Sequence, residues 1–177
     1  MSEFLIRESN LEDVPELMRL YKKVSTKGGL GRTEEEINAD YISDFLHKCQ
    51  ARGKGLILYV ATEPNKVIGE INGYTLGLKT FAHVFEQITM VIDPAYQGLG
   101  LGKKLLQALQ TEIQNLMPWI MKIELACFSN NIPALQLYMH QGFIIEGKRK
   151  NRVRLTTGEF ADGLALGWFN PNYKPAG

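Results

Sequence analysis

The sequence predicts one mixed α/β domain, and two observations lead to this fold class. The first is the order of β-rich and amphipathic runs, which reads β, α, α, β, β, β, α, β, α, β, β along the 177 residues. The second is that neither an internal repeat nor a linker-like composition interrupts this order. About seven strands and about four helices are therefore expected in a single domain spanning residues 1–177.

The first three elements are a strand and two helices. Phe4–Glu8 alternates apolar and polar residues as a strand does, and Asn10 can cap the helix that follows. A second helix is expected to begin after Thr33, because Glu36 lies three residues later and completes a capping box. This second helix should run to about Arg52.

Three β-rich runs come next. Residues 56–62 and 67–74 flank a turn at residues 63–66, an arrangement that indicates an antiparallel hairpin. Residues 83–92 are almost continuously apolar, which is typical of a strand covered on both faces. This run ends at Asp93-Pro94.

The last five elements rest on helical spacing, caps and turn residues. They are a helix that Pro118 stops, a strand at residues 120–128, a short helix capped by Asn130 or Asn131 and closed by Gly142, and two strands at residues 143–155 and 160–168 joined by the turn at Thr157-Gly158.

Composition excludes several classes of function. Lys and Arg number 20 against 19 Asp and Glu, so the chain has no electrostatic footprint for nucleic acid or an anionic membrane. Cys49 and Cys127 lack metal-ligand spacing, the three His residues are scattered, and no metal is expected. We expect both thiols to be reduced and buried. With no secretory leader and no apolar run of roughly 20 residues, a soluble cytoplasmic protein is expected.

A glycine-rich turn, Gln97–Lys104, lies between a buried strand and an amphipathic helix. Backbone N–H groups at the start of a helix can bind a phosphate, provided that no Cβ atom prevents its approach. The glycine spacing fits neither the dinucleotide fingerprint nor the P-loop, because Lys103 stands where the P-loop needs glycine. The alternative is a turn that needs glycine for positive φ and binds nothing.

Two motifs carry a family resemblance. Gln97-x-x-Gly100-x-Gly102, preceded by the strand end Val91-Ile92-Asp93-Pro94, resembles the R/Q-x-x-G-x-G/A signature of the GNAT acetyltransferases. Asn131-x-x-Ala134-x-x-Leu137-Tyr138-x-x-x-Gly142-Phe143 resembles that family's later motif, at the expected distance and on a short helix. The likeness extends over the element order from Phe4 to Trp168, although only Ile88–Phe143 carries specific residues.

The resemblance implies a mostly antiparallel sheet whose fourth and fifth strands splay apart to form a cleft for acetyl-CoA. The glycine turn would hold the pyrophosphate, and the preceding strand would pair with the pantetheine arm. The residues that it implies for acetyl-CoA binding are Met90, Val91, Ile92, Gln97, Gly98, Leu99, Gly100, Leu101, Gly102, Lys103, Lys104, Asn131, Ala134 and Tyr138.

Acetyl transfer to an amine needs a base for the ammonium and a proton for the leaving thiolate. Glu86, a carboxylate in an otherwise apolar strand, is the candidate base, as several family members carry a glutamate there. The alternative is a glutamate satisfied by water at the strand's exposed end. Tyr138 is the candidate acid, and the alternative is a tyrosine that only packs on its helix. An amide near Val91 would polarise the thioester carbonyl, as the resemblance implies.

These features predict an N-acetyltransferase in which a primary amine attacks acetyl-CoA directly in a ternary complex. The acceptor could be a polyamine, an amino acid-like small molecule or a protein N-terminus, and the sequence does not separate them. A non-catalytic acyl-CoA sensor is the alternative. A homodimer fits the resemblance, since many relatives dimerise. The basic stretch Lys148–Arg154 could meet a substrate carboxylate or a CoA phosphate, although a solvated strand edge accounts for it better.

Overall fold

A computed structural model describes residues 4–26, 30–60, 66–155 and 157–175. These residues form two compact units, and one strand and one helix each contribute residues to both. The first unit comprises residues 1–74 and 89–109, and the second comprises residues 75–88 and 110–177.

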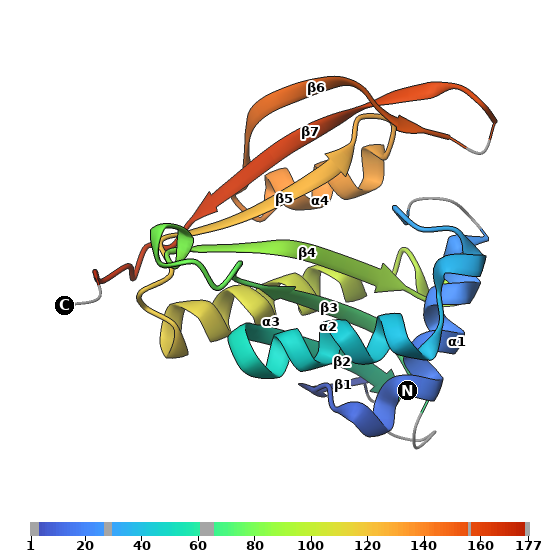
Figure 1. Cartoon of the computed structure of the whole chain (residues 1–177), viewed down its shortest axis with the longest axis horizontal. Helices are drawn as coiled ribbons and strands as arrows, with labels where there is room; N and C mark the ends of the chain where they lie inside the picture. Colours follow the sequence, from blue (N-terminus) through green and yellow to red (C-terminus); the bar gives the residue numbers. More distant parts are fainter. Residues whose placement is uncertain (1–3, 27–29, 61–65, 156, 176–177) are drawn as a thin grey trace. The chain divides into compact units, whose positions relative to one another are not determined.

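The helices and strands follow the predicted order (Figure 1). They are β1 (Phe4–Glu8), α1 (Val14–Ser25), α2 (Ala39–Arg52), β2 (Gly53–Val60), β3 (Val67–Tyr74), β4 (Val84–Ile92), α3 (Leu101–Leu116), β5 (Lys122–Phe128), α4 (Ile132–His140), β6 (Ile144–Arg154) and β7 (Phe160–Phe169). The strand order is β1-β2-β3-β4-β5-β7-β6. β4 and β5 are parallel, whereas β1–β2, β2–β3, β5–β7 and β6–β7 are antiparallel. The predicted α/β fold, with a mixed sheet of about seven strands and about four helices, is confirmed in the described residues.

The predicted start of the second helix is wrong. Thr33 and Glu36 do form a capping box, but it opens only the single 3-10 turn Glu34–Glu36. Ile37 is extended, with φ −96° and ψ 100°, so the chain leaves the helical conformation there. Helix α2 begins later, where Asn38 Oδ1 accepts a hydrogen bond from the backbone N–H of Tyr41 at 2.9 Å. A local capping signal was therefore real, but the element that it caps is one turn long.

The predicted full burial of the strand at residues 83–92 is wrong, because only Phe85 and Val91 of β4 are buried and Gln87 is exposed. Gln87 has a φ of 57°, which breaks the regular alternation of the two faces in the middle of the strand. β4 and β5 pair in the described chain only at Val84–Lys122 and Phe85–Ile123. The turn predicted at residues 63–66 lies mostly outside the described residues.

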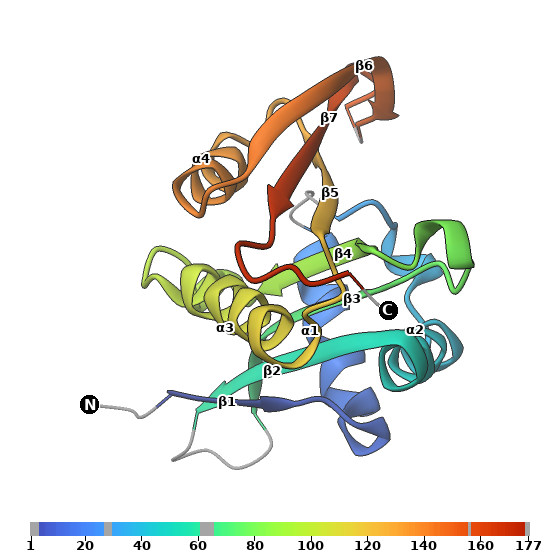
Figure 2. The ribbon, with the colours of Figure 1, turned by 90° about the vertical axis from the view of Figure 1, so that its left-hand side faces the viewer.

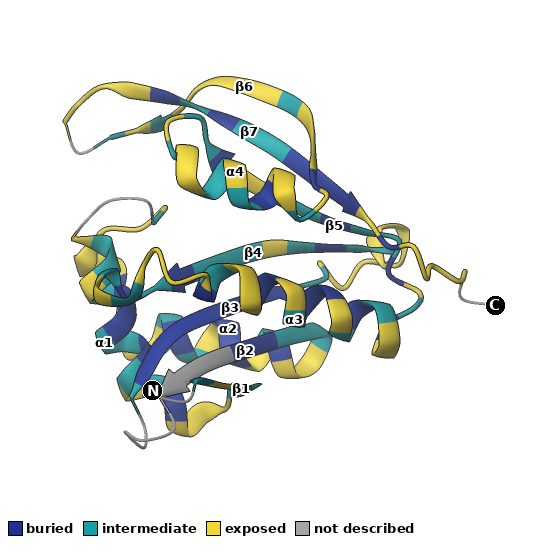
Figure 3. Cartoon of the chain, turned by 180° about the vertical axis from the view of Figure 1, so that it is seen from behind, coloured by how far each residue is buried: buried dark blue, intermediate teal, exposed yellow. Residues whose placement is uncertain are grey.

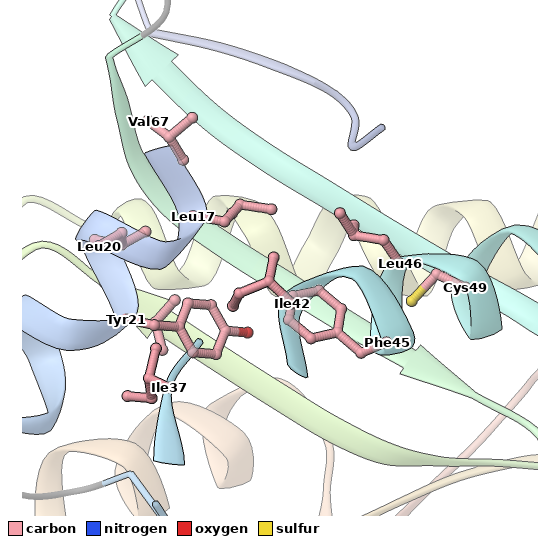
Figure 4. Packing of buried hydrophobic residues seen from close by; sticks show 10 residues of the cluster. Leu17, Leu20, Tyr21, Ile37, Ile42, Phe45, Leu46, Cys49 and Val67 are labelled. Atoms are coloured by element: carbon pink, nitrogen blue, oxygen red, sulfur yellow. The ribbon is translucent and has the colours of Figure 1, made fainter. Parts of the chain in front are cut away.

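In the first unit, α1 and α2 pack against β2 and β3. Figure 4 shows the apolar side chains of α1 facing those of α2. The cluster consists of Leu17, Leu20, Tyr21, Ile37, Ile42, Phe45, Leu46, Cys49, Val67 and Val91, each at most 4% exposed. Burying an aliphatic or aromatic side chain fully is worth about 1.5 to 3 kcal/mol. This cluster is therefore the main source of stability that holds α1 and α2 on the sheet.

A carboxyl group is buried in this apolar cluster. Glu70 on β3 is fully buried, and its Oε2 accepts hydrogen bonds from the Tyr21 hydroxyl at 2.6 Å and from Asn72 Nδ2 at 3.1 Å. Its Oε1 has no hydrogen-bond partner among the described residues. Burial raises the pKa of Glu70 to about 8, although the two hydrogen bonds act in the opposite direction. At neutral pH this carboxyl group therefore holds its proton.

The second unit contains a long hairpin of β6 and β7 beside β5. β6 is the edge strand, and Figure 3 shows it as largely exposed. Its basic residues are solvated, as predicted, and Lys148 forms an ion pair with Asp162 at 2.7 Å. The turn between the two strands contains Gly158, whose φ of +88° favours glycine. Figure 2 shows α4 as a separate short helix in this unit.

Candidate active site

Within the first unit, Asp93 holds the end of β4 in place. Its backbone N–H donates to Ile68 O at 2.7 Å, and its carboxylate accepts from Lys23 Nζ at 2.7 Å and from the Ala95 N–H at 2.9 Å. Burial alone would raise the pKa of Asp93, but the bonds and charges of Lys23, Ala95 and Arg19 hold that pKa below its usual value. The strand end that precedes the glycine turn is thereby held by an ionised carboxylate.

The glycine turn has the conformation that its sequence predicts. Gly98 and Gly100 have φ values of +78° and +75°, a region that other residues seldom adopt. Among the described residues, a Cβ atom added at either glycine would meet nothing within 4 Å. The turn is therefore open on the side that each Cβ atom would occupy.

Helix α3 begins directly after this turn. Lys104 N–H donates to Gly100 O at 3.2 Å, whereas the N–H groups of Leu101, Gly102 and Lys103 precede the point at which helical acceptors become available. Such unpaired N–H groups, together with the helix dipole, favour an anion at this end. The residues present thus fit a phosphate or pyrophosphate group.

Close packing beneath the turn also depends on a glycine. A Cβ atom at Gly69 of β3 would lie 2.8 Å from Ile92 Cδ1 and 3.1 Å from Leu105 Cδ1. Both distances are shorter than ordinary contacts between carbon atoms. Gly69 therefore allows β3, the end of β4 and the first turns of α3 to come close together within the first unit.

The candidate base lies where β4 stops pairing with β5. Glu86 is half-buried and directly follows the last paired residue, Phe85. The next residue, Gln87, has a φ of 57°, which is uncommon for a residue with a side chain and interrupts the regular strand. Burial and then the negative charge of Glu124 raise the pKa of Glu86, while a hydrogen bond with Gln87 acts against them. A carboxylate in this environment is a stronger base than an ordinary surface glutamate.

The later motif forms α4 and the turn after it. Of the two predicted caps, Asn130 and Asn131, it is Asn131 that caps the helix, and its Oδ1 accepts from the Ala134 N–H at 3.3 Å. Tyr138 is 8% exposed, and its ring lies 5.6 Å from the ring of Phe143. Burial raises the pKa of the Tyr138 phenol, and nearby Cys127 adds to this shift. The phenol therefore stays protonated over the whole neutral range.

The predicted site residues fall into both units. The first unit contains the end of β4 and the glycine turn, which are Met90, Val91, Ile92, Gln97, Gly98, Leu99, Gly100, Leu101, Gly102, Lys103 and Lys104. The second unit contains Glu86, Asn131, Ala134 and Tyr138. Their roles in binding and catalysis stay predictions.

Sequence reasoning missed three residues around Glu86. The sequence assigns Lys122 and Glu124 only to the strand at residues 120–128, and Gln87 carries no glycine-like signal for positive φ. One signal was available, because two charged residues in the alternating pattern Lys122-Ile123-Glu124 share one face of the strand. It could have indicated a charged group beside the candidate base.

Two features are absent from the described residues. No helix in residues 4–26, 30–60, 66–155 and 157–175 is long and apolar enough to cross a membrane. Within the same residues, no group of three or more His, Cys, Asp or Glu side chains is placed to hold a metal ion. Cys49 and Cys127 are both buried and free, as predicted.

Two comparisons with solved structures show the fold. The acetyltransferase of the GNAT family from Streptococcus pneumoniae superposes with a TM-score of 0.84 and 24% identity, covering 94% of this chain and 99% of that chain. A phosphinothricin acetyltransferase from Sinorhizobium meliloti, solved in complex with acetyl-CoA, gives a TM-score of 0.85 and 15% identity, covering 99% and 94%.

Two comparisons of sequence are more specific. The spermine/spermidine N(1)-acetyltransferase of Bacillus subtilis is 46% identical over 57 residues, which cover 32% of this chain and 37% of that relative's length. Residues 53–145, more than half of the chain, match the family model described as the acetyltransferase (GNAT) domain. The chain therefore belongs to the GNAT acetyltransferase family.

Proposed function

We propose that this protein transfers the acetyl group of acetyl-CoA to a primary amine by direct attack in a ternary complex. The observation that carries the proposal is the start of α3, where two glycines with positive φ precede helix N–H groups that lack helical acceptors. Such a turn suits the pyrophosphate of CoA. Membership of the GNAT family supports this choice of anion over a nucleotide phosphate.

The acceptor that we propose first is a polyamine. The Bacillus subtilis relative that is 46% identical over 57 residues is named for spermine and spermidine, which favours this class over the others. Amino acid-like molecules and peptide N-termini are the further members of the test panel. Each is a primary amine, so the same chemistry applies to all three.

The first chemical requirement is a neutral amine. An alkyl ammonium has a pKa near 10, so at neutral pH it must lose a proton before its nitrogen can attack. Glu86 is the proposed base. Its raised pKa and its place at the end of the β4–β5 ladder give it both basicity and contact with solvent.

The second requirement is a stabilised leaving group. Acetyl-CoA supplies the acetyl thioester, and we propose that the backbone N–H of Val91 polarises its carbonyl. Tyr138, protonated because burial raises its pKa, is the proposed donor of a proton to the departing sulfur. In the balanced reaction the ammonium first loses one proton to Glu86, which passes it to solvent. The neutral amine nitrogen then gains the acetyl group and loses a second proton, and the CoA sulfur gains one.

Direct attack is favoured over an acetylated cysteine. Burial raises the pKa of Cys127 to about 11 and that of Cys49 to about 12. Because the thiolate is the nucleophilic form, neither residue supplies a useful amount of nucleophile at neutral pH. The amine itself is therefore the proposed attacking group.

The test is CoA release measured over a panel of amines, with mass spectrometry of the products. We expect acetyl-CoA to be consumed only when an amine is present, with polyamines giving the highest kcat/KM. Binding of acetyl-CoA without turnover of any amine would contradict the proposal and indicate a cofactor sensor. The absence of acetyl-CoA binding, measured by calorimetry, would remove the assignment of the glycine turn.

A further inference from the structure

A chain of charged side chains extends away from Glu86 across the sheet of the second unit. On β5, Lys122 Nζ lies 3.0 Å from Glu124 Oε2, and it also lies 2.6 Å from Glu146 Oε2 on β6. Glu124 is the first residue after the last β5 residue that pairs with β4, just as Glu86 is on β4. The Lys122 ammonium group thus forms ion pairs with both Glu124 and Glu146. The negative charge of Glu124 in turn acts on Glu86.

Strand β7 lies between β5 and β6, so the Lys122–Glu146 pair must cross it. It crosses at Gly167, which is in register with Glu124 on one side and Ile144 on the other. A Cβ atom at Gly167 would lie 2.6 Å from Glu146 Oε2 and 2.7 Å from Lys122 Cε. Any side chain at this position would therefore displace the pair.

Glu146 reaches Lys122 from an irregular part of β6. The register between β6 and β7 shifts between Ile145 and Gly147, which places Glu146 at a β-bulge. A bulge changes the direction in which a side chain leaves its strand. The bulge, the glycine and the buried part of Lys122, whose side chain is 15% exposed, together hold the ammonium group beside Glu124.

We propose that Lys122 and Glu124 are positioning residues that set the pH at which the catalytic base Glu86 takes up its proton. This inference rests on the proposed function, because it concerns the base of that reaction. Glu124 disfavours the ionised form of Glu86, and Lys122 limits this effect by holding a positive charge against Glu124. Lys122 is itself held by Glu146.

Among the described residues, the groups that act on Glu86 directly are Gln87 and Glu124. Gln87 on β4 offers a neutral hydrogen bond, β5 contributes Glu124 and Lys122, and β6 contributes Glu146 through Lys122. β7 contributes Gly167, which has no charge, at the crossing point. These charges determine the direction in which each substitution should change the pH at which Glu86 is protonated. Removing Glu124 should lower the pH at which Glu86 is protonated, and removing Lys122 should raise it.

The experiment measures the acid limb of the kcat/KM profile in five proteins. These are the parent, Glu124→Gln, Lys122→Met, Lys122→Arg and the control Lys148→Met, which breaks the separate Lys148–Asp162 pair on the same hairpin. We expect the acid limb to shift to lower pH by about half a unit in Glu124→Gln and to higher pH by a similar amount in Lys122→Met. It should stay in place in Lys122→Arg and Lys148→Met.

A second readout separates this inference from the proposed function. Titration of the Glu86 carboxyl group followed by 13C NMR, assigned with Glu86→Gln, reports its protonation even if no amine is acetylated. Opposite shifts in Glu124→Gln and Lys122→Met support the inference whatever the acceptor is. Equal titration of Glu86 in the parent, Glu124→Gln and Lys122→Met, with melting temperatures confirming that all are folded, would overturn it.

Discussion

The two units each contain a carboxyl group whose pKa is raised by burial, but the two groups differ in their partners. Glu70 is fully buried and bonded to the neutral groups of Tyr21 and Asn72. Glu86 is half-buried, and its neighbour Glu124 is a charged carboxylate. The difference teaches that a raised pKa alone does not identify a catalytic base. Contact with solvent and with other charges must accompany it.

Each unit also contains a buried tyrosine, and the same contrast applies to them. The Tyr21 hydroxyl donates to Glu70 at 2.6 Å, so its proton already takes part in a hydrogen bond inside the core. The Tyr138 hydroxyl has no hydrogen-bond partner within the described part of the chain, and its ring packs on Phe143. This arrangement is what the proposed acid role of Tyr138 requires, whereas the Tyr21 hydroxyl already donates to Glu70.

The largest effect is expected at Glu86. Glu86→Gln should lower kcat at neutral pH by about 10² to 10⁴, the usual contribution of general acid–base catalysis. Glu70→Gln should leave kcat within a factor of a few, because the neutral amide resembles the protonated carboxyl group that it replaces. Steady-state CoA release with the preferred amine measures both. Equal losses in the two variants would break the distinction between the two glutamates.

The next effect concerns stability and belongs to Glu70. Its pKa is about 8 in the folded chain, against an ordinary value of 4.5, so only the unfolded chain is ionised between these values. The stability that the protonated form contributes is complete below the lower pKa and is lost as pH rises towards the higher one. Between about pH 5 and pH 8 the parent should lose a few kcal/mol relative to Glu70→Gln.

Urea unfolding of both proteins across this pH range gives the measurement. Glu86→Gln is the matched control, and it should keep most of the parent's pH dependence because Glu86 is only partly buried. Parallel stability curves for the parent and Glu70→Gln would show that Glu70 is ionised in the folded chain.

A smaller effect on the rate is expected for the tyrosines. Tyr138→Phe keeps the ring beside Phe143 and removes only the hydroxyl, so kcat should fall by about 10² while the Kd for acetyl-CoA changes little. Tyr21→Phe should instead lower the melting temperature, because it removes a hydrogen bond to a buried carboxyl group. Loss of acetyl-CoA affinity in Tyr138→Phe with unchanged turnover would make Tyr138 a binding residue.

Local signals in the sequence predicted local structure well. Gly98 and Gly100 adopt positive φ because the turn between a strand and a helix needs it, and Asn131 caps α4 through its own side chain. The capping box at Thr33 predicted the start of a long helix, but the helix does not continue because Ile37 is extended. The conformation of Ile37 depends on how that segment packs. Sequence spacing alone does not contain this information.

The row of charged side chains that leads from Glu124 through Lys122 to Glu146 could not be predicted in the same way. Its contacts depend on β7 lying between β5 and β6, and on the bulge at Glu146. Residues 122, 146 and 167 are distant in the sequence and meet only through this strand order. The sequence thus located the candidate base, and the register of the sheet located the residues around it.

The pH–rate profile of Glu86→Gln beside the parent tests the central claim most directly. If Glu86 removes the proton of the amine, the variant should be slow at neutral pH and should recover as pH approaches the pKa of the amine, near 10, where the neutral nucleophile forms unaided. The parent should lose activity on the acid side as Glu86 becomes protonated. A variant whose profile has the parent's shape and height would contradict the account and remove Glu86 from the mechanism.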